Sequence, residues 1–168
     1  MLRPDYPVGT ERLVLRPFEE GDLDDTFAVT DGNRPLYIEP RTREEAAKPL
    51  ARWSSQRELT EPGQCLVLAV VLEDRVIGKV ELTWRSREQG EIGYILNEEF
   101  RGNGYAREAG RQMLKFGFDH LGLQQIIARC DPSNEPSRRV LERLGMSKVE
   151  EEDLYMYVML ADEYRKLK

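Results

Sequence analysis

The sequence contains few of the residues that build metal sites or disulfide frameworks. Its 168 residues include two cysteines, Cys65 and Cys130, and one histidine, His120. There is no C-x-x-C pair, so the sequence argues against a zinc site. The cysteines lie far apart in otherwise apolar stretches, which is typical of buried thiols in a reducing cytoplasm. We therefore expect neither a metal nor a disulfide.

Long apolar runs are also absent. No run approaches the ~20 residues needed to span a bilayer, and the start MLRPDYPVGTE has no apolar signal core. A net charge of -6 argues against a general nucleic-acid binder. The apolar share of 40% and the charged share of 33% are ordinary for a globular chain. We expect a single domain over residues 1–168, cytoplasmic, with no membrane or nucleic-acid partner.

The pattern of apolar residues predicts a mixed α/β chain of the α+β type. Strands are predicted within residues 11–18, 64–84 (a hairpin), 91–96, 124–130 and 146–160 (two strands). Helices are predicted within 19–30, 42–58, 104–120 and 137–145, with a short charged tail at 161–168 and an irregular segment at 31–41. This order predicts a central, mostly antiparallel sheet of about seven strands with flanking helices. Because a helix joins 91–96 to 124–130, those two strands should be parallel.

The stretch RGNGYA, residues 101–106, lies between a predicted strand and a predicted helix. Free N–H groups and the dipole at a helix start favour an anion. Gly102 and Gly104 allow close backbone approach, and Arg101 and Arg107 add positive charge. On these grounds the loop is either a phosphate site or only a turn. The P-loop pattern GxxxxGK[ST] is absent, and Arg107 replaces the third glycine of the dinucleotide pattern GxGxxG.

The same six residues match the R/Q-x-x-G-x-G/A signature of the GCN5-related N-acetyltransferase (GNAT) superfamily. Residues 11–25, ERLVLRPFEEGDLDD, resemble the opening strand and helix of its ribosomal-protein N-terminal acetyltransferase branch. Residues 91–146 resemble the core of that branch, with Asn134, Ser137 and Gly145 at similar spacing. The resemblance covers nearly the whole chain and is weakest over 31–63.

The resemblance implies the GNAT fold, with acetyl-CoA as co-substrate. It implies that the backbone amides of six residues hold the pyrophosphate: Arg101, Gly102, Asn103, Gly104, Tyr105 and Ala106. It further implies that the strands at 91–96 and 124–130 splay apart, and that the pantetheine arm lies between them and pairs with the backbone of Leu96. Asn134 is expected to contact CoA. The simpler interpretations are strand core for Leu96 and a helix N-cap for Asn134.

Acetyl transfer to an amine requires a base for the amine and stabilisation of the leaving thiolate. By resemblance, Glu91 lies near the position of the general base in the histone-acetylating members. Glu81, which shares a strand face with Thr83, is the rival, and ordered water is a third route. Either glutamate could instead be an ordinary polar surface residue.

Many members of the superfamily protonate the thiolate with a tyrosine seven residues after the asparagine, a position that Leu141 occupies here. The resembling branch tends to carry a serine three residues after the asparagine, and Ser137 matches. A serine hydroxyl can donate a hydrogen bond to the sulfur. The simpler interpretation of Ser137 is helix capping.

The function implied by the resemblance is direct transfer of the acetyl group from acetyl-CoA to a primary amine. A protein N-terminal α-amino group of the ribosomal-protein type is expected first, and a small amine, polyamine or amino acid is the alternative. A non-catalytic acyl-CoA-binding module, a nucleotide-binding module and a homodimer remain open. Tyr37 could line an acceptor pocket, and the acidic run at 150–153 is a solvated turn or an acidic mouth.

Overall fold

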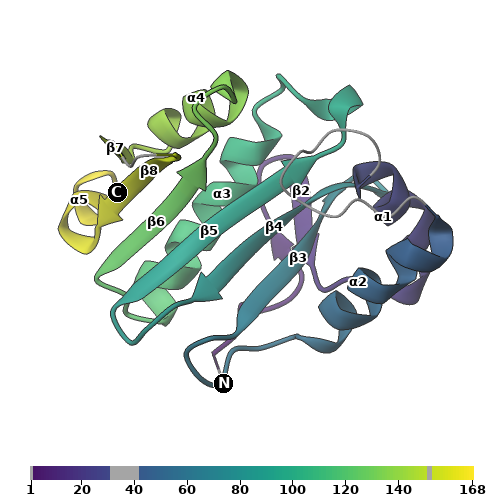
Figure 1. The fold of residues 1–168 in the computed structure, drawn as a ribbon. Helices are drawn as coiled ribbons and strands as arrows, with labels where there is room; N and C mark the ends of the chain where they lie inside the picture. Colours follow the sequence, from purple (N-terminus) through teal and green to yellow (C-terminus); the bar gives the residue numbers. More distant parts are fainter. Residues whose placement is uncertain (1, 31–41, 151–152) are drawn as a thin grey trace.

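A computed structural model describes residues 2–30, 42–150 and 153–168 (Figure 1). Its strands form one eight-stranded sheet in the order β1-β2-β3-β4-β5-β6-β8-β7. The strands are β1 (Val8–Gly9), β2 (Leu13–Arg16), β3 (Cys65–Leu72), β4 (Arg75–Trp84), β5 (Gln89–Leu96), β6 (Gln125–Cys130), β7 (Ser147–Glu150) and β8 (Tyr155–Leu160). The mixed sheet confirms the predicted fold class. The extra strand is β1, which at two residues is too short to show alternation.

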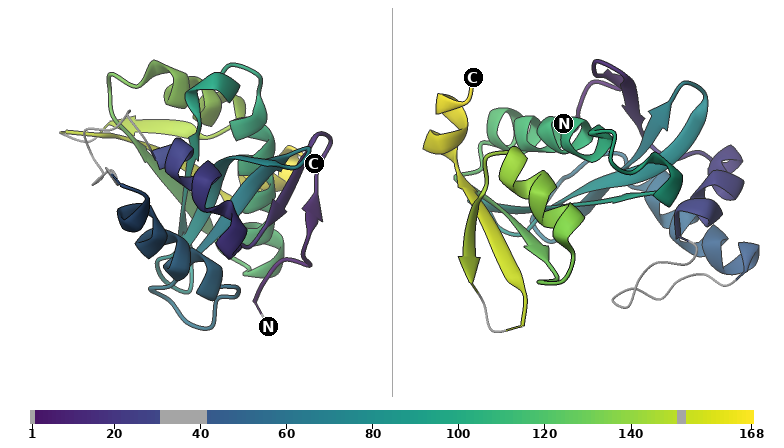
Figure 2. Two further views of the ribbon diagram at one scale, coloured as in Figure 1. Left: turned by 90° about the vertical axis from the view of Figure 1, so that its right-hand side faces the viewer. Right: turned by 90° about the horizontal axis from the view of Figure 1, so that it is seen from above.

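Helices lie on both faces of the sheet (Figure 2). They are α1 (Leu23–Thr30), α2 (Arg43–Ser55), α3 (Tyr105–Lys115), α4 (Glu135–Arg143) and α5 (Ala161–Lys166). The α2 helix is continuous through Pro49, and it begins where the Thr42 side chain accepts a hydrogen bond from the Glu45 amide. The segment at 31–41, which includes Tyr37, lies outside the described residues, as do 151 and 152 of the acidic run.

Two hydrophobic cores explain why the helices divide between the faces. The larger core lies under α3 and α4 and is built from buried residues of both helices and the sheet, including Leu82, Ile92, Met113, Leu141 and Tyr157. The smaller core lies under α2 and includes Phe18, Leu50, Val67, Ala69 and Val71. Alternation along β3 and β4 places successive side chains in different cores. The two faces of β5 therefore meet different surroundings.

The strands β5 and β6 are parallel, as predicted, but they pair over a short distance only. The paired residues are Gln89 with Gln125, Gly90 with Ile126, and Glu91 with Ile127. Beyond Glu91 the strands diverge, with β6 leading toward α4 and β5 toward the loop before α3 (Figure 1). On its other edge β5 stays paired with β4 as far as Leu96. Residues 92–96 of β5 therefore border an opening in the sheet.

Candidate functional site

The loop at 101–106 has the backbone geometry of an anion site. Gly102 and Gly104 have φ values of +79° and +83°, in the left-handed region that favours glycine. Gly104 immediately precedes α3 and offers no side-chain cap. In the described part of the chain, the backbone N–H groups of residues 102–107 have no hydrogen-bond partner. These amides can therefore bind a phosphate at the positive end of the helix dipole.

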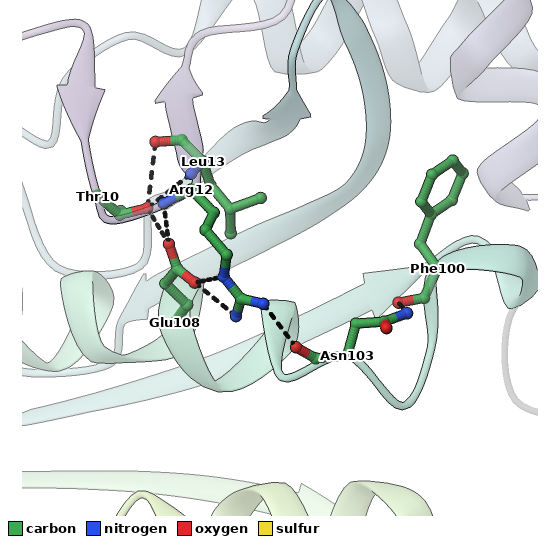
Figure 3. Close-up of polar contacts among 6 residues, drawn as sticks. All are labelled: Thr10, Arg12, Leu13, Phe100, Asn103 and Glu108. Atoms are coloured by element: carbon green, nitrogen blue, oxygen red, sulfur yellow. Dashed lines mark hydrogen bonds and ion pairs between the residues drawn. The ribbon is translucent and has the colours of Figure 1, made fainter.

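A side-chain clamp holds this loop against the N-terminal strands (Figure 3). Arg12, just before β2, donates from Nε to Glu108 Oε2 at 2.9 Å and from Nη1 to the Asn103 carbonyl oxygen at 3.0 Å. Glu108 Oε1 also accepts from the Arg12 amide at 2.7 Å and from the Thr10 hydroxyl. The sequence analysis missed Arg12, Thr10 and Glu108, because their contacts join segments far apart in the chain.

The clamp sets the protonation state of Glu108. Burial alone would raise the pKa of this carboxyl, but hydrogen bonds from Thr10 and Arg12, with the charge of Arg12, outweigh burial and hold the pKa below its usual range. Glu108 is therefore an anion at neutral pH. The segment before β2 is therefore tied to α3 by an ion pair, and Arg12 of this pair also holds the loop through the Asn103 carbonyl oxygen.

The end of β5 combines core packing with a free backbone edge. The Leu96 side chain is buried in the larger core, which agrees with the simpler interpretation of this residue. Its carbonyl oxygen accepts from Arg101 Nε at 3.1 Å. The Arg101 side chain thus ties the loop back to the strand that precedes it. The expected backbone pairing of Leu96 with a pantetheine arm would take place beside this contact.

The start of α4 lies across the opening from β5. Asn134 is the N-cap, and its side-chain oxygen accepts from the Ser137 amide at 3.2 Å, which confirms the capping prediction. The Ser137 hydroxyl lies 3.0 Å from the Tyr94 hydroxyl on β5. Leu141 is 1% exposed and packs in the larger core. The hydroxyl groups of Ser137 and Tyr94 therefore meet between the start of α4 and β5, and Leu141 contributes no hydroxyl there.

Glu91 lies at the point where β5 and β6 separate, on the face opposite α3. Its Oε2 atom accepts from Arg85 Nε at 2.8 Å and from Arg129 Nη1 at 2.8 Å. The Glu91 side chain is 18% exposed, whereas the two arginines are 48% and 38% exposed. The sequence analysis missed both arginines. Both arginines contact the same oxygen, Oε2, and no hydrogen bond or ion pair to Oε1 occurs among the described residues.

Glu81 lies on the same face, directly opposite Gly93 in the β4–β5 pairing. One carboxylate oxygen forms an ion pair with Lys79, whose ammonium group lies 5.1 Å from the centre of the Trp53 ring. The other oxygen, Oε1, would be 2.9 Å from a Cβ atom added at Gly93. Gly93 therefore leaves room for this carboxylate over the part of β5 that does not pair with β6, beside the opening.

Other features of the described residues carry no site of their own. Both cysteines are free thiols, Cys130 buried and Cys65 half-buried, and burial raises the pKa of each. No group of three or more metal-binding side chains occurs in the part of the chain that is described. Within the same residues, no helix is long and apolar enough to cross a membrane.

Comparison with known proteins agrees with this geometry. Residues 12–147 match the family model of the acetyltransferase (GNAT) domain. The uncharacterized N-acetyltransferase YnaD of Bacillus subtilis (strain 168) is 30% identical over 171 residues, covering 94% of this chain and 98% of YnaD. The crystal structure of a GNAT-family acetyltransferase from Bacillus anthracis is 28% identical with a TM-score of 0.78, covering 92% and 98% of the two chains. The chain belongs to the GNAT family of N-acetyltransferases, whose members use acetyl-CoA.

Proposed function

We propose that this enzyme transfers the acetyl group of acetyl-CoA directly to a protein N-terminal α-amino group, as ribosomal-protein acetyltransferases do. The observation that carries the choice of acceptor is the charge around Glu91, where two guanidinium groups share one carboxylate. A polyamine brings further ammonium groups to this surface, which the arginines would repel. A peptide N-terminus brings one amine followed by carbonyl oxygens, which guanidinium groups can bind.

Structural neighbours support the fold for either class of acceptor. A Vibrio cholerae protein provisionally described as a ribosomal-protein-serine acetyltransferase is 18% identical, with a TM-score of 0.78. A variant of the SpeG spermidine N-acetyltransferase of Vibrio cholerae is 20% identical, with a TM-score of 0.73. At these identities only the fold is shared. The choice between a peptide and a polyamine therefore depends on the residues of this chain.

Acetyl-CoA fits the α3 side of the opening. The partnerless amides of residues 102–107 suit its pyrophosphate, and the clamp formed by Arg12 and Glu108 fixes the loop that presents them. The unpaired edge of β5 as far as Leu96 suits the amide groups of its pantetheine arm. Asn134 and Ser137 at the start of α4 lie across the opening and complete the proposed contacts.

The two faces of the sheet divide the chemistry. A thioester in the opening has Ser137 on the α4 side and the glutamates on the other. In the reaction a neutral amine attacks the acetyl carbon, the C–S bond breaks, and its electron pair goes to sulfur. The proton lost from nitrogen passes to a carboxylate, directly or through water. Among the described residues, each glutamate has one oxygen, Oε1, outside its ion pairs. Glu91 has two guanidinium partners, Arg85 and Arg129, whereas Glu81 has the single ammonium partner Lys79 and lies beside Gly93. We therefore place Glu81 before Glu91 as the base.

An acceptor panel tests this proposal. Lysine-free peptides with free N-termini, the same peptides with acetylated N-termini, spermidine and free amino acids are each mixed with acetyl-CoA, and thiol release is followed. We expect release with free peptides and none with the blocked peptides, which have the same sequence but no amine. Faster turnover of spermidine or an amino acid would overturn the choice of acceptor. Tight CoA binding without release for any amine would support a non-catalytic binding module.

A further inference from the structure

Tyr94 lies in the splayed part of β5 and points toward α4. It is three residues beyond Glu91, the last residue that pairs with β6. Its neighbour across the β4–β5 pairing is Val80, which is fully buried in the larger core. The Tyr94 ring therefore lies on the α3 and α4 side of the sheet, within the opening that suits the pantetheine arm.

The Tyr94 hydroxyl joins β5 to the first turn of α4. It lies 3.0 Å from the Ser137 carbonyl oxygen and 3.0 Å from the Ser137 hydroxyl oxygen. A tyrosine has one proton to donate, and a serine hydroxyl can both donate and accept. When Tyr94 donates to the Ser137 hydroxyl oxygen, the serine proton is free to point to a third atom. When Tyr94 donates to the carbonyl, the serine proton can be drawn back to the tyrosine oxygen.

We infer that Tyr94 is a positioning residue that turns the Ser137 hydroxyl proton toward the sulfur of CoA. This inference rests on the proposed place of Ser137 at the sulfur and not on the identity of the acceptor. The C–S bond breaks, its electron pair goes to sulfur, and the thiolate accepts a hydrogen bond from Ser137. CoA leaves as the thiolate and is protonated by water, so neither hydroxyl gains or loses a proton overall.

The surroundings of Tyr94 suit a permanent donor. Burial raises the pKa of its hydroxyl well above the ordinary value, and the bond to Ser137 lowers it in part. The group therefore keeps its proton throughout the working pH range. Since Leu141 is buried apolar core, no tyrosine occupies the helix position that serves the sulfur in many resembling enzymes. A tyrosine reaching in from β5 would support the serine in its place.

The experiment titrates the thiol of bound CoA, which needs no acceptor. The ultraviolet absorbance of the thiolate is followed against pH, with the complex of desulfo-CoA as baseline to subtract protein tyrosines and cysteines. We expect S137A to raise the pKa of the bound thiol by about one unit, because it removes the hydrogen bond to the thiolate. Y94F should raise this pKa by about half a unit, because the Ser137 proton is then less well directed toward the sulfur. In the S137A background Y94F should add nothing, since Tyr94 acts through the serine.

The matched control is Y157F. Tyr157 is fully buried, and its hydroxyl lies 3.1 Å from Glu142 Oε1, so this change also removes a buried tyrosine hydroxyl, but one bonded to Glu142 rather than to Ser137. It should leave the bound thiol pKa unchanged. Melting temperature and CoA affinity are measured for every variant to show that it folds and binds. With an active acceptor, Y94F should lower kcat ~3- to 10-fold with little change in KM for acetyl-CoA.

Each other outcome is decisive. If the pKa of the bound thiol is the same in S137A as in wild type, Ser137 does not contact the sulfur. The role inferred for Tyr94 is then wrong as well. A shifted pKa in S137A with a normal pKa in Y94F would overturn the inference and leave the serine in place. An equal shift by Y94F with and without Ser137 would mean that Tyr94 acts through packing, which also overturns it.

Discussion

Arg12 and Glu108 are joined across 96 residues of sequence by a salt bridge in which Arg12 Nη2 lies 2.8 Å from Glu108 Oε2. The same guanidinium donates to the Asn103 carbonyl oxygen and lies 4.6 Å from the centre of the Tyr105 ring. One side chain thus holds both the loop at 101–106 and the first turns of α3. The preformed state of the proposed pyrophosphate site depends on it.

Replacing Arg12 should weaken binding of acetyl-CoA. R12A removes the hydrogen bond to the loop and leaves Glu108 without its ion-pair partner, so the amides lose their fixed orientation. We expect KM for acetyl-CoA to rise ~10-fold with a smaller change in kcat, a pattern measured by steady-state kinetics. The control is R165A, which breaks an exposed ion pair with Asp162 on α5. Equal acetyl-CoA affinity in folded R12A and wild type would contradict this role.

The lowered pKa of Glu108 should make the stability of the fold depend on pH in the acidic range. Its pKa is lowered in the folded protein, so its contribution to stability is present above the ordinary glutamate pKa of about 4.3 and is lost as pH falls through the lower folded value. The variant E108Q should have a lower free energy of unfolding than wild type at neutral pH. This difference in stability should become smaller as the pH is lowered. Chemical denaturation at a series of pH values measures this. The same difference in unfolding free energy at every pH would show that the charge of the Glu108 carboxylate does not stabilise the fold.

The left-handed glycine before α3 provides a test of the loop. A valine at Gly104 must adopt φ near +83°, and its Cβ would come within 3.4 Å of Arg12 Nη2. G104V should cost ~1–2 kcal/mol of stability and weaken CoA binding ~10-fold or more, measured by calorimetry. G122V carries a similar backbone penalty at φ +68° in open space. It should lose stability and keep CoA affinity, so a parallel loss of affinity in both variants would argue against the loop site.

The two glutamates on the acceptor face should respond differently to neutralisation. E81Q should lower kcat/KM for the amine ~100-fold, with the largest loss at low pH, where few amines are neutral and water is a weak base. E91Q leaves Arg85 and Arg129 without their shared anion and should mainly change KM for the amine. Full pH–rate profiles of both variants measure this. If E81Q keeps the wild-type pH–rate profile and E91Q loses activity across the pH range, Glu91 and not Glu81 is the base.

Several predictions succeeded because local chemistry decides them. The cap at Asn134 depends on residues within one helical turn, and the structure shows it. The hairpin of β3 and β4 follows from two β-rich runs around a short polar turn. The parallel pairing of β5 and β6 follows from the helix that connects them. In each case the contacting residues are close in sequence or joined by one connection of known handedness.

The contacts around Glu91, Glu81 and Ser137 were beyond such reasoning. Which residues face Glu91 depends on the register that brings β6 beside β5, and Arg129 has no motif of its own. The room for Glu81 depends on Gly93 being directly opposite it on the neighbouring strand. A shift of one residue in either register would turn these side chains to the other face.

The sequence by itself predicted the order of elements and, through its resemblance to the GNAT superfamily, acetyl-CoA as the donor. The glycine loop and its spacing to Asn134 and Ser137, which carry that resemblance, are properties of continuous chain. Only the tertiary structure decided how that site is held and what faces it. Arg12 reaches Glu108, and Tyr94 reaches Ser137, because the sheet places distant segments side by side. The hydrophobic cores on the two faces set those distances, and the strand register within the sheet is what aligns the polar groups.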